Sequence, residues 1–166
     1  MTDPRAGLRL STDAAEMDVD AIHAYLSGES YWAAGIPREV VERAIRNSLC
    51  FGIFDGGAQV AFARAITDRA TYAYLADVYV LRPYRGRGLS RWMMEEIIAH
   101  PELQGLRRWM LMTKDAQGLY AQFGFVPTPR PERCMERTTP NAYAAPAGPG
   151  GQERVSSPPA SGEPAE

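Results

Sequence analysis

The chain has 166 residues, of which 45% are hydrophobic and 23% are charged, and its formal net charge is -2. A chain of this length and composition is expected to form one globular domain with a sizeable hydrophobic core. Its slightly acidic balance lacks the overall basic footprint of nucleic-acid-binding proteins, so nucleic acid is not an expected partner.

Cysteine and histidine usage points away from a disulfide framework and from a metal site. Cys50 and Cys134 lie far apart without a CxxC spacing, and His23 and His100 lack the spacing of metal ligands. We therefore expect no metal, and we expect both cysteines to be buried small hydrophobic residues instead of nucleophiles. The N-terminal residues lack the apolar core of a secretory signal, and no window approaches about 18 uninterrupted apolar residues, so we expect a cytoplasmic protein that makes no membrane contact.

The N-terminal part of the chain predicts one strand and two helices. Residues 7–12 form a short strand candidate. Asp18 can cap a helix whose apolar residues share one face, namely Val19, Ile22 and Leu26. Pro37 suits the first turn of a second helix, whose buried stripe would be Val41, Ala44 and Ile45.

Three strands are expected next, in an antiparallel meander. They cover residues 49–54, 58–66 and 71–81, which are rich in β-branched and aromatic side chains. The turns between them fall at residues 55–57 and around Asp68, and both contain residues that suit short hairpins.

A helix and a parallel strand are expected to follow the meander. After Gly88 the apolar positions have a helical period, and His100-Pro101 ends that helix. Residues 107–113 predict a further strand, and a short helix is expected to begin at Asp115 and to stop at Gly124. A last strand is expected from residues 123–127, with residues 133–137 completing it. The fold class is thus α/β with a mixed sheet, antiparallel at first and parallel in a final β-α-β unit.

The composition changes from about Thr138. Residues 138–166 are roughly one-third Pro plus Gly and contain almost no large aliphatic residues. Such a segment buries too little apolar surface to offset its ordering entropy. We therefore expect a domain over residues 1–137 and a disordered tail over residues 138–166.

The turn between the third meander strand and the next helix carries glycines among arginines, at Arg85-Gly86-Arg87-Gly88-Leu89-Ser90. A strand-to-helix turn of this kind leaves backbone N–H groups unpaired at the positive end of the helix dipole, so it can cradle phosphate groups. The string G-x-x-x-x-G-K-[ST] of P-loop nucleotide-binding proteins is absent, and the dinucleotide fingerprint G-x-G-x-x-G fails because Arg91 stands at its third glycine.

This turn fits the pattern [RQ]-x-x-G-x-[GA], and in this respect it resembles the pyrophosphate loop of the GNAT superfamily of N-acetyltransferases. The order of the predicted elements is also similar, and so is the motif LYxxxGF, which stands here over residues 119–125. The resemblance covers about residues 7–130. It departs at Ser90, where the superfamily usually has Gly or Ala, and at Thr113 and Ala116, in a region where many relatives carry an asparagine.

The resemblance implies an acetyl-CoA site. The pyrophosphate of acetyl-CoA would lie on the N–H groups of residues 85–90, with charge from Arg85 and Arg87; the expected binding residues of this loop are Arg85, Gly86, Arg87, Gly88, Leu89 and Ser90. In this superfamily the third meander strand and the next strand splay apart. The pantetheine arm would then pair with backbone groups beside Val78, Tyr79 and Val80, like an added strand.

The resemblance also implies a direct attack of an amine on the thioester, within a ternary complex. Tyr120 would be the general acid that protonates the departing sulfur, the alternative being a tyrosine that packs in the core. Asp77 is a charge inside an apolar strand, which alternation places on one face with Leu75 and Tyr79. It is either the base that helps to take the amine proton or a carboxylate that is satisfied by backbone N–H groups at a β-bulge.

The acceptor site is less marked in the sequence. Tyr31 and Trp32 lie on the loop between the first two helices, which commonly covers the acceptor in this superfamily, and Tyr74 lies nearby on the central strand. These aromatic residues could line an amine pocket or pack at its rim. Arg64 could pair with an acceptor carboxylate, or it could belong to a solvated or ion-paired face.

The expected function is therefore transfer of an acetyl group from acetyl-CoA to a primary amine, with a small molecule favoured as the acceptor. Three alternatives remain: a module of the same fold that senses acyl-CoA without catalysis, an N-acetyltransferase of proteins, and a nucleic-acid patch around residues 82–88. Dimers are frequent in the superfamily, so a homodimer is compatible with the resemblance, although no stretch identifies an interface.

Overall fold

The computed structural model describes residues 5–144. Five strands form one sheet in the order β1-β2-β3-β4-β5: Leu8–Ser11, Leu49–Asp55, Ala58–Thr67, Tyr72–Val80 and Arg108–Met110. Neighbouring strands are antiparallel except for β4 and β5, which are parallel. The expected mixed sheet is thus confirmed.

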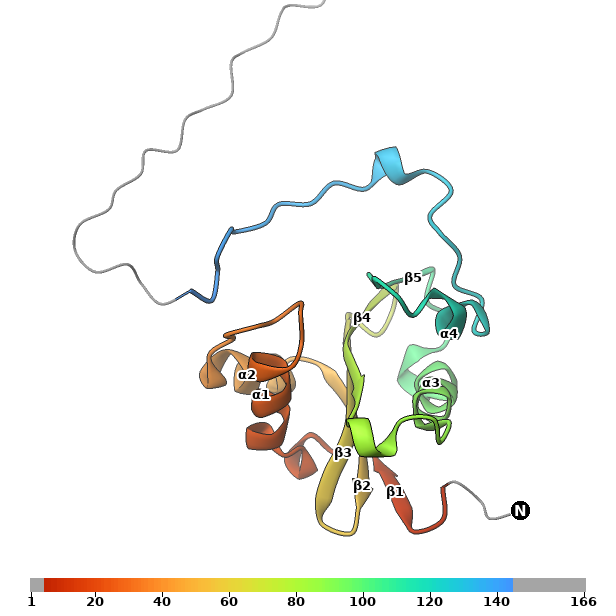
Figure 1. The fold of residues 1–166 in the computed structure, drawn as a ribbon. Helices are drawn as coiled ribbons and strands as arrows, with labels where there is room; N and C mark the ends of the chain where they lie inside the picture. The colour runs from red at the N-terminus through yellow and green to blue at the C-terminus, as the bar shows by residue number, and fades with distance from the viewer. Residues whose placement is uncertain (1–4, 145–166) are drawn as a thin grey trace, which may run out of the picture.

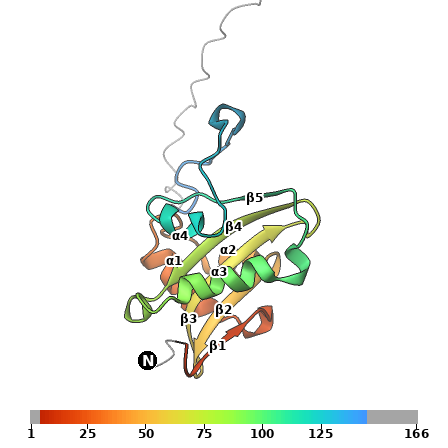
Figure 2. The same ribbon diagram turned by 90° about the vertical axis from the view of Figure 1, so that its right-hand side faces the viewer.

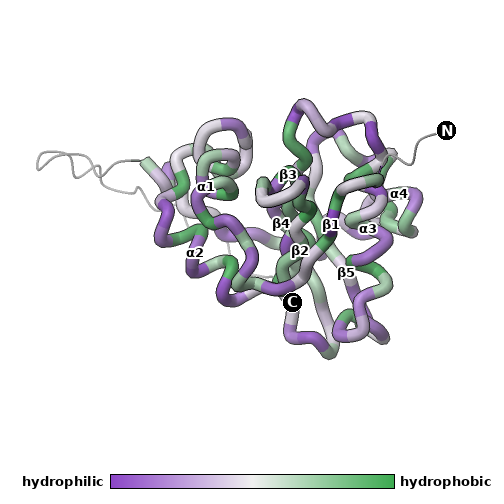
Figure 3. Tube along the Cα trace, turned by 90° about the horizontal axis from the view of Figure 1, so that it is seen from below, coloured by the Kyte–Doolittle hydropathy of each residue, from purple (hydrophilic) through white to green (hydrophobic). Residues whose placement is uncertain are grey.

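The helices cover the two faces of this sheet. They are α1 (Val19–Gly28), α2 (Arg38–Arg46), α3 (Leu89–Ala99) and α4 (Gln117–Ala121). Helices α1 and α2 lie on one side of the strands and α3 and α4 on the other (Figure 1 and Figure 3), and α3 lies across the strands in the view of Figure 2. Among residues 5–144, no helix is both long enough and apolar enough to cross a membrane.

Local sequence signals set several of these boundaries. The Asp18 side chain accepts a hydrogen bond from the N–H of Ala21 and caps α1, as the sequence predicts. Pro37 stands at the N-cap of α2. The Asp68 carboxylate accepts hydrogen bonds from the Thr71 hydroxyl and from three backbone N–H groups in the turn from β3 to β4. Together these donors hold its pKa well below the usual range; the backbone donors are Ala70, Thr71 and Tyr72.

Two hydrophobic clusters fill the space on the two faces of the sheet. The cluster under α3 contains Phe51, Leu75 and Met93, all nearly inaccessible to solvent. The cluster under α1 and α2 contains Ile22, Leu26 and Phe62. Burying side chains of this size stabilises the fold by roughly 1.5–3 kcal/mol each. Hydrophobic packing therefore covers both faces of the sheet, so functional residues are expected at its edges and at the ends of its strands.

Strands β4 and β5 pair only over a short length. The paired residues are Tyr72 with Arg108, Ala73 with Trp109 and Tyr74 with Met110. Beyond Tyr74, β4 continues to Val80 without a described partner on the β5 side. The two strands therefore splay apart, as the resemblance implies.

The structure corrects the expected C-terminal part of the sheet. Strand β5 ends at Met110 instead of residue 113, and neither residues 123–127 nor residues 133–137 form a strand. Prolines at positions 127, 129 and 131 remove every second N–H group of this segment, so it cannot build a regular ladder against β5. Helix α4 also begins later than expected, after Ala116 instead of at Asp115.

The segment after α4 crosses the molecule instead. It passes from the α4 side of the sheet toward the loop between α1 and α2 (Figure 1). At its far end the backbone oxygen of Tyr143 lies 3.4 Å from the position that a Cβ would take on Gly35, within that loop. Most of the expected disordered tail, residues 145–166, lies outside the described residues.

Candidate functional site

The turn from β4 to α3 has the features of an anion site. Gly86 and Gly88 adopt left-handed conformations with φ of 76° and 74°, which glycine tolerates best. Gly88 is the N-cap of α3 and no side chain caps this helix end. In the described part of the chain, the N–H groups of Gly88, Leu89 and Ser90 donate to no protein acceptor. They are thus available to an anion at the positive end of the α3 dipole.

Arg85 braces this turn from within. Its Nε donates to the carbonyl oxygen of Val80 at 2.9 Å, and its Nη2 donates to the hydroxyl of Tyr25 at 3.2 Å. Tyr25 itself stacks on Tyr79, with ring centroids 3.8 Å apart. The guanidinium therefore links the end of β4 to α1, and part of its donor capacity is used inside the protein. Arg87 lies over the ring of Tyr84.

Asp77 lies at a β-bulge of β4. Its φ is 54°, and the register between β3 and β4 shifts at this point. The bulge reverses the alternation, so the expectation that Asp77 shares a face with both Leu75 and Tyr79 is wrong: Leu75 belongs to the cluster under α3 and Tyr79 to the cluster under α1 and α2. Asp77 lies on the α1 and α2 side with Tyr79.

Both oxygens of Asp77 accept hydrogen bonds from side chains. Oδ2 accepts from Nε of Arg64, and Oδ1 accepts from Nε1 of Trp32 at 2.9 Å. Arg64 also donates to the hydroxyl of Ser48 at 3.1 Å. The Asp77 side chain is only 9% exposed. Arg64 is thus part of an internal ion pair. The bulge at Asp77 is as the second interpretation expected, but side chains instead of backbone N–H groups satisfy the carboxylate.

Tyr120 lies on α4 and is buried, with 8% of its surface exposed. Its burial raises its pKa to about 12, and the neighbouring Tyr31 and Asp115 add to this shift. Burial likewise raises the pKa of Tyr74, whose hydroxyl is also in contact with the backbone of Met112. Both phenols therefore stay protonated around neutral pH.

The loop between α1 and α2 reaches the loop after β5. The hydroxyl of Tyr31 accepts a hydrogen bond from the N–H of Lys114 at 3.3 Å, and the Lys114 ammonium lies over the Tyr31 ring. Tyr31 packs edge-on against Trp32. Tyr31 and Trp32 are 60% and 42% exposed, so they lie at the rim of the site instead of inside it.

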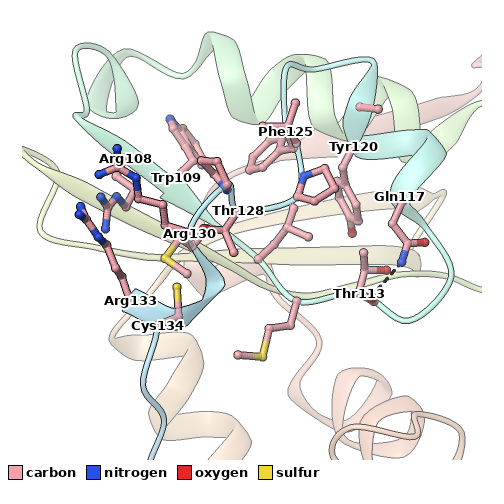
Figure 4. A pocket seen from close by; sticks show the side chains of 17 residues that line it. Arg108, Trp109, Thr113, Gln117, Tyr120, Phe125, Thr128, Arg130, Arg133 and Cys134 are labelled. Atoms are coloured by element: carbon pink, nitrogen blue, oxygen red, sulfur yellow. Dashed lines mark hydrogen bonds between the residues drawn. The ribbon is translucent and has the colours of Figure 1, made fainter.

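The side chain of Tyr120 lines a cavity of about 930 Å³ beside β5 (Figure 4). Its walls come from residues 108–113, from α4 and from residues 125–134. Cys134 lines it and is exposed, so the expectation of a buried Cys134 is wrong. Cys50 is buried as expected, and burial raises its pKa to about 11. Residues 5–144 contain no group of three or more His, Cys, Asp or Glu residues that could hold a metal.

The structure brings together most of the site residues that the sequence predicts. Val78, Tyr79 and Val80 lie at the splayed end of β4, and a single 3-10 turn, Arg82–Tyr84, connects them to the loop over residues 85–90. Trp32 contacts Asp77. The sequence did not reveal Ser48 as a partner of Arg64, nor the three arginines of the cavity, Arg108, Arg130 and Arg133. Arg130 and Arg133 lie in the segment after α4, where the alternating prolines were the available signal against a strand.

Comparisons with known proteins agree with this geometry. Residues 18–125 match the Acetyltransferase (GNAT) family. A protein of Gibberella zeae named as a candidate acetyltransferase is 37% identical over 140 residues, which cover 71% of this chain and 78% of that protein.

Solved structures give the same result. The crystal structure of a candidate GNAT-family acetyltransferase from Xanthomonas campestris pv. campestris has a TM-score of 0.81 and 52% identity, over 83% of this chain and 97% of that one. A predicted acetyltransferase from Clostridium acetobutylicum, solved with acetyl-CoA, shares the fold at a TM-score of 0.57 and 16% identity, over 79% of this chain and 94% of that one. The chain thus belongs to the GNAT family of acetyltransferases and is an acyltransferase.

Proposed function

We propose that this protein transfers the acetyl group of acetyl-CoA to a primary amine of a small molecule, by direct attack in a ternary complex. The observation that carries the proposal is the set of unpaired N–H groups of Gly88, Leu89 and Ser90 at the start of α3. They lie next to the splayed end of β4, and a buried tyrosine lines the adjacent cavity.

The residues present fit acetyl-CoA. The open turn at Gly86 and Gly88 would hold the pyrophosphate, since a Cβ at either position would meet no protein atom within 4 Å and the space beside the turn is clear. Arg85 keeps the turn in place through Val80 and Tyr25, while its remaining N–H groups and Arg87 add positive charge. The unpaired side of β4 beside Val78, Tyr79 and Val80 would hold the pantetheine amides as an added strand holds its neighbour.

When bound, acetyl-CoA supplies an activated thioester, and the protein must supply a proton for the departing sulfur. Tyr120 is the group proposed for this role. Its raised pKa, about 12, keeps the phenol protonated, and burial places it away from competing water. The phenol donates its proton as the C–S bond breaks and regains one from solvent after release of the products.

Asp77 is proposed as a positioning residue instead of the base. Arg64 and Trp32 already donate to both of its oxygens, so it fixes the bulge of β4 and the loop that carries Trp32. The amine then enters in its unprotonated form, and the proton that its nitrogen loses after the attack passes to water. Removing Asp77 would therefore loosen the acceptor side of the site without removing a proton acceptor.

The acceptor is proposed to be a small molecule because the site is partly enclosed. Tyr31 bridges to the Lys114 loop, Trp32 covers Asp77, and Tyr74 lies at the point where β4 and β5 separate. The C-terminal segment passes over the same end of the sheet (Figure 1). A folded protein surface would reach Tyr120 less easily than a free amine. A cytoplasmic location and a homodimer stay predictions.

A CoA-sensing module of the same fold is the second candidate, and one experiment separates the two. Purified protein is incubated with acetyl-CoA and a panel of primary amines, and both released CoA thiol and acetylated amine are quantified. Equal amounts of thiol and acetylated amine, with a reduced rate in Tyr120→Phe, support the enzyme. Acetyl-CoA binding without turnover of any amine would support the sensing module and overturn the proposed reaction.

A further inference from the structure

The cavity beside β5 differs in character between its two ends. Figure 4 shows Tyr120, Gln117 and Thr113 at one end and the arginines 108, 130 and 133 gathered near Cys134 at the other. Trp109 and Phe125 lie between these two ends in the same view, and the apolar part of the lining also includes Leu111, Val126 and Pro127. The volume of about 930 Å³ suits a small organic ligand, since binding pockets typically measure roughly 300–1,000 Å³.

The arginine end carries uncompensated positive charge. No acidic residue lines the cavity, and within residues 5–144 none of Arg108, Arg130 and Arg133 forms an ion pair. Other arginines do form ion pairs, among them Arg5, Arg9, Arg38, Arg46, Arg64, Arg69 and Arg91. Glu132 and Glu136 are neighbours in sequence but do not pair with these three side chains. A guanidinium group is well suited to bind a carboxylate or a phosphate.

This charge lies away from the expected pyrophosphate loop. Arg108 pairs with Tyr72 at the start of β4, whereas the loop follows Val80 at its end. At about 3.3 Å per residue, the two ends of β4 are separated by roughly 26 Å. The arginine end is therefore too far from the loop to contact the same pyrophosphate.

We propose that the acceptor is an amine whose other end carries a carboxylate or a phosphate, joined to the amine by an apolar spacer. The anionic group lies between Arg108, Arg130 and Arg133, the spacer packs on Trp109 and Phe125, and the amine points toward Tyr120. This inference rests on the proposed function, because it places the acceptor in the cavity that the general acid lines.

The test compares unbranched amines of similar length that differ at the far end: ε-aminocaproate, aminohexyl phosphate, hexylamine and diaminohexane, with shorter and longer homologues of each. The protein should acetylate the carboxylate or the phosphate probe with kcat/KM about tenfold or more above hexylamine, and diaminohexane should be the poorest. The better of the two anionic probes identifies the head group. Equal kcat/KM for hexylamine and the anionic probes would overturn the inference while leaving the proposed function in place.

Arginine variants locate the effect. Arg108→Gln, Arg130→Gln and Arg133→Gln should each raise KM for the anionic probe about three- to tenfold, and each should raise KM for hexylamine much less. Arg107→Gln is the matched control, because Arg107 is an exposed neighbour that does not line the cavity. Unaltered KM in the three cavity variants would contradict the proposal. Since all three side chains are exposed, the variants should fold like the wild type.

A second readout does not depend on turnover. Cys134 lines the cavity and is exposed, so iodoacetamide should alkylate it. The anionic probe should slow this alkylation in the wild type and in Arg107→Gln, but not in the triple arginine variant, and hexylamine should not slow it. Protection without any acetylation would show that the anion site exists and that the proposed function fails, whereas turnover without protection would place the acceptor elsewhere.

Discussion

Arg64 on β3 donates from Nε to Oδ2 of Asp77 at the bulge of β4, and the two side chains are 17% and 9% exposed. The pair joins two central strands directly beneath the loop that carries Trp32. Because Trp32 donates to the other oxygen of Asp77, the backbone irregularity and the acceptor-side loop share one anchor. The effect expected of Asp77→Asn depends on this arrangement.

Asp77→Asn should reduce stability and leave the pH dependence of catalysis unchanged. The substitution removes the carboxylate from a largely buried guanidinium, which costs about 1–3 kcal/mol of the free energy of unfolding. Urea denaturation measures this loss, and the pH profile of kcat/KM tests the chemistry. Asp20→Asn, which breaks an exposed pair with Arg38, is the control and should change stability little. Disappearance of an acidic limb in the Asp77→Asn profile would instead identify Asp77 as the base.

Tyr120→Phe should lower kcat about 10- to 100-fold without weakening acetyl-CoA binding, because only the proton donor is lost. The pKa of Tyr120 is raised to about 12, so its proton-donating form persists as pH rises. The wild type should accordingly show no loss of kcat from this group at any pH below about 11. Tyr72→Phe, which removes a hydroxyl at the start of β4, is the control. Unchanged kcat in Tyr120→Phe would contradict the assignment.

Tyr25→Phe should weaken acetyl-CoA binding about two- to fivefold at constant kcat. It removes the acceptor for Nη2 of Arg85 and so loosens the turn that follows β4. Calorimetric titration measures the affinity, with Tyr143→Phe as a control on the C-terminal segment. Identical affinities of Tyr25→Phe and the wild type would show that Arg85 holds the turn through Val80 alone.

The two thiols should differ sharply in reactivity. Cys134 is exposed, whereas Cys50 is buried and its pKa is raised to about 11, so at pH 8 only about one thousandth of Cys50 is thiolate. Iodoacetamide should modify one thiol quickly in the native protein and two after unfolding, as mass spectrometry would show. Cys134→Ser should abolish the fast reaction. Rapid modification of Cys50 would contradict its burial, and an acetylated cysteine in protein incubated with acetyl-CoA alone would contradict the ternary-complex mechanism.

Features that depend on neighbouring residues could be predicted from the sequence. The cap of α1 by Asp18, the turn at Asp68 and the glycine turn before α3 each need only a few adjacent residues to form. Because these turns divide the chain at the right places, the meander and the parallel β4-α3-β5 unit could be predicted too.

Features set by contacts between distant residues could not be predicted. The bulge at Asp77 reverses the strand alternation, and its partners Arg64 and Trp32 lie 13 and 45 residues away in the chain. The segment after α4 contains β-forming residues, but its alternating prolines prevent pairing with β5 and leave a cavity there. The arginines of that cavity come from β5 and from this irregular segment, so no single motif marks them.

The central claim is that the turn over residues 85–90 binds acetyl-CoA, and calorimetric titration of two matched glycine variants tests it most directly. Gly88 and Gly105 have similar left-handed conformations, with φ of 74° and 71°, and both have open space beside them. Gly88→Ala and Gly105→Ala should therefore lose a similar amount of stability, about 1 kcal/mol. Acetyl-CoA should bind the wild type and Gly105→Ala with equal affinity and Gly88→Ala at least about tenfold more weakly. Equal affinity in all three proteins would contradict the account.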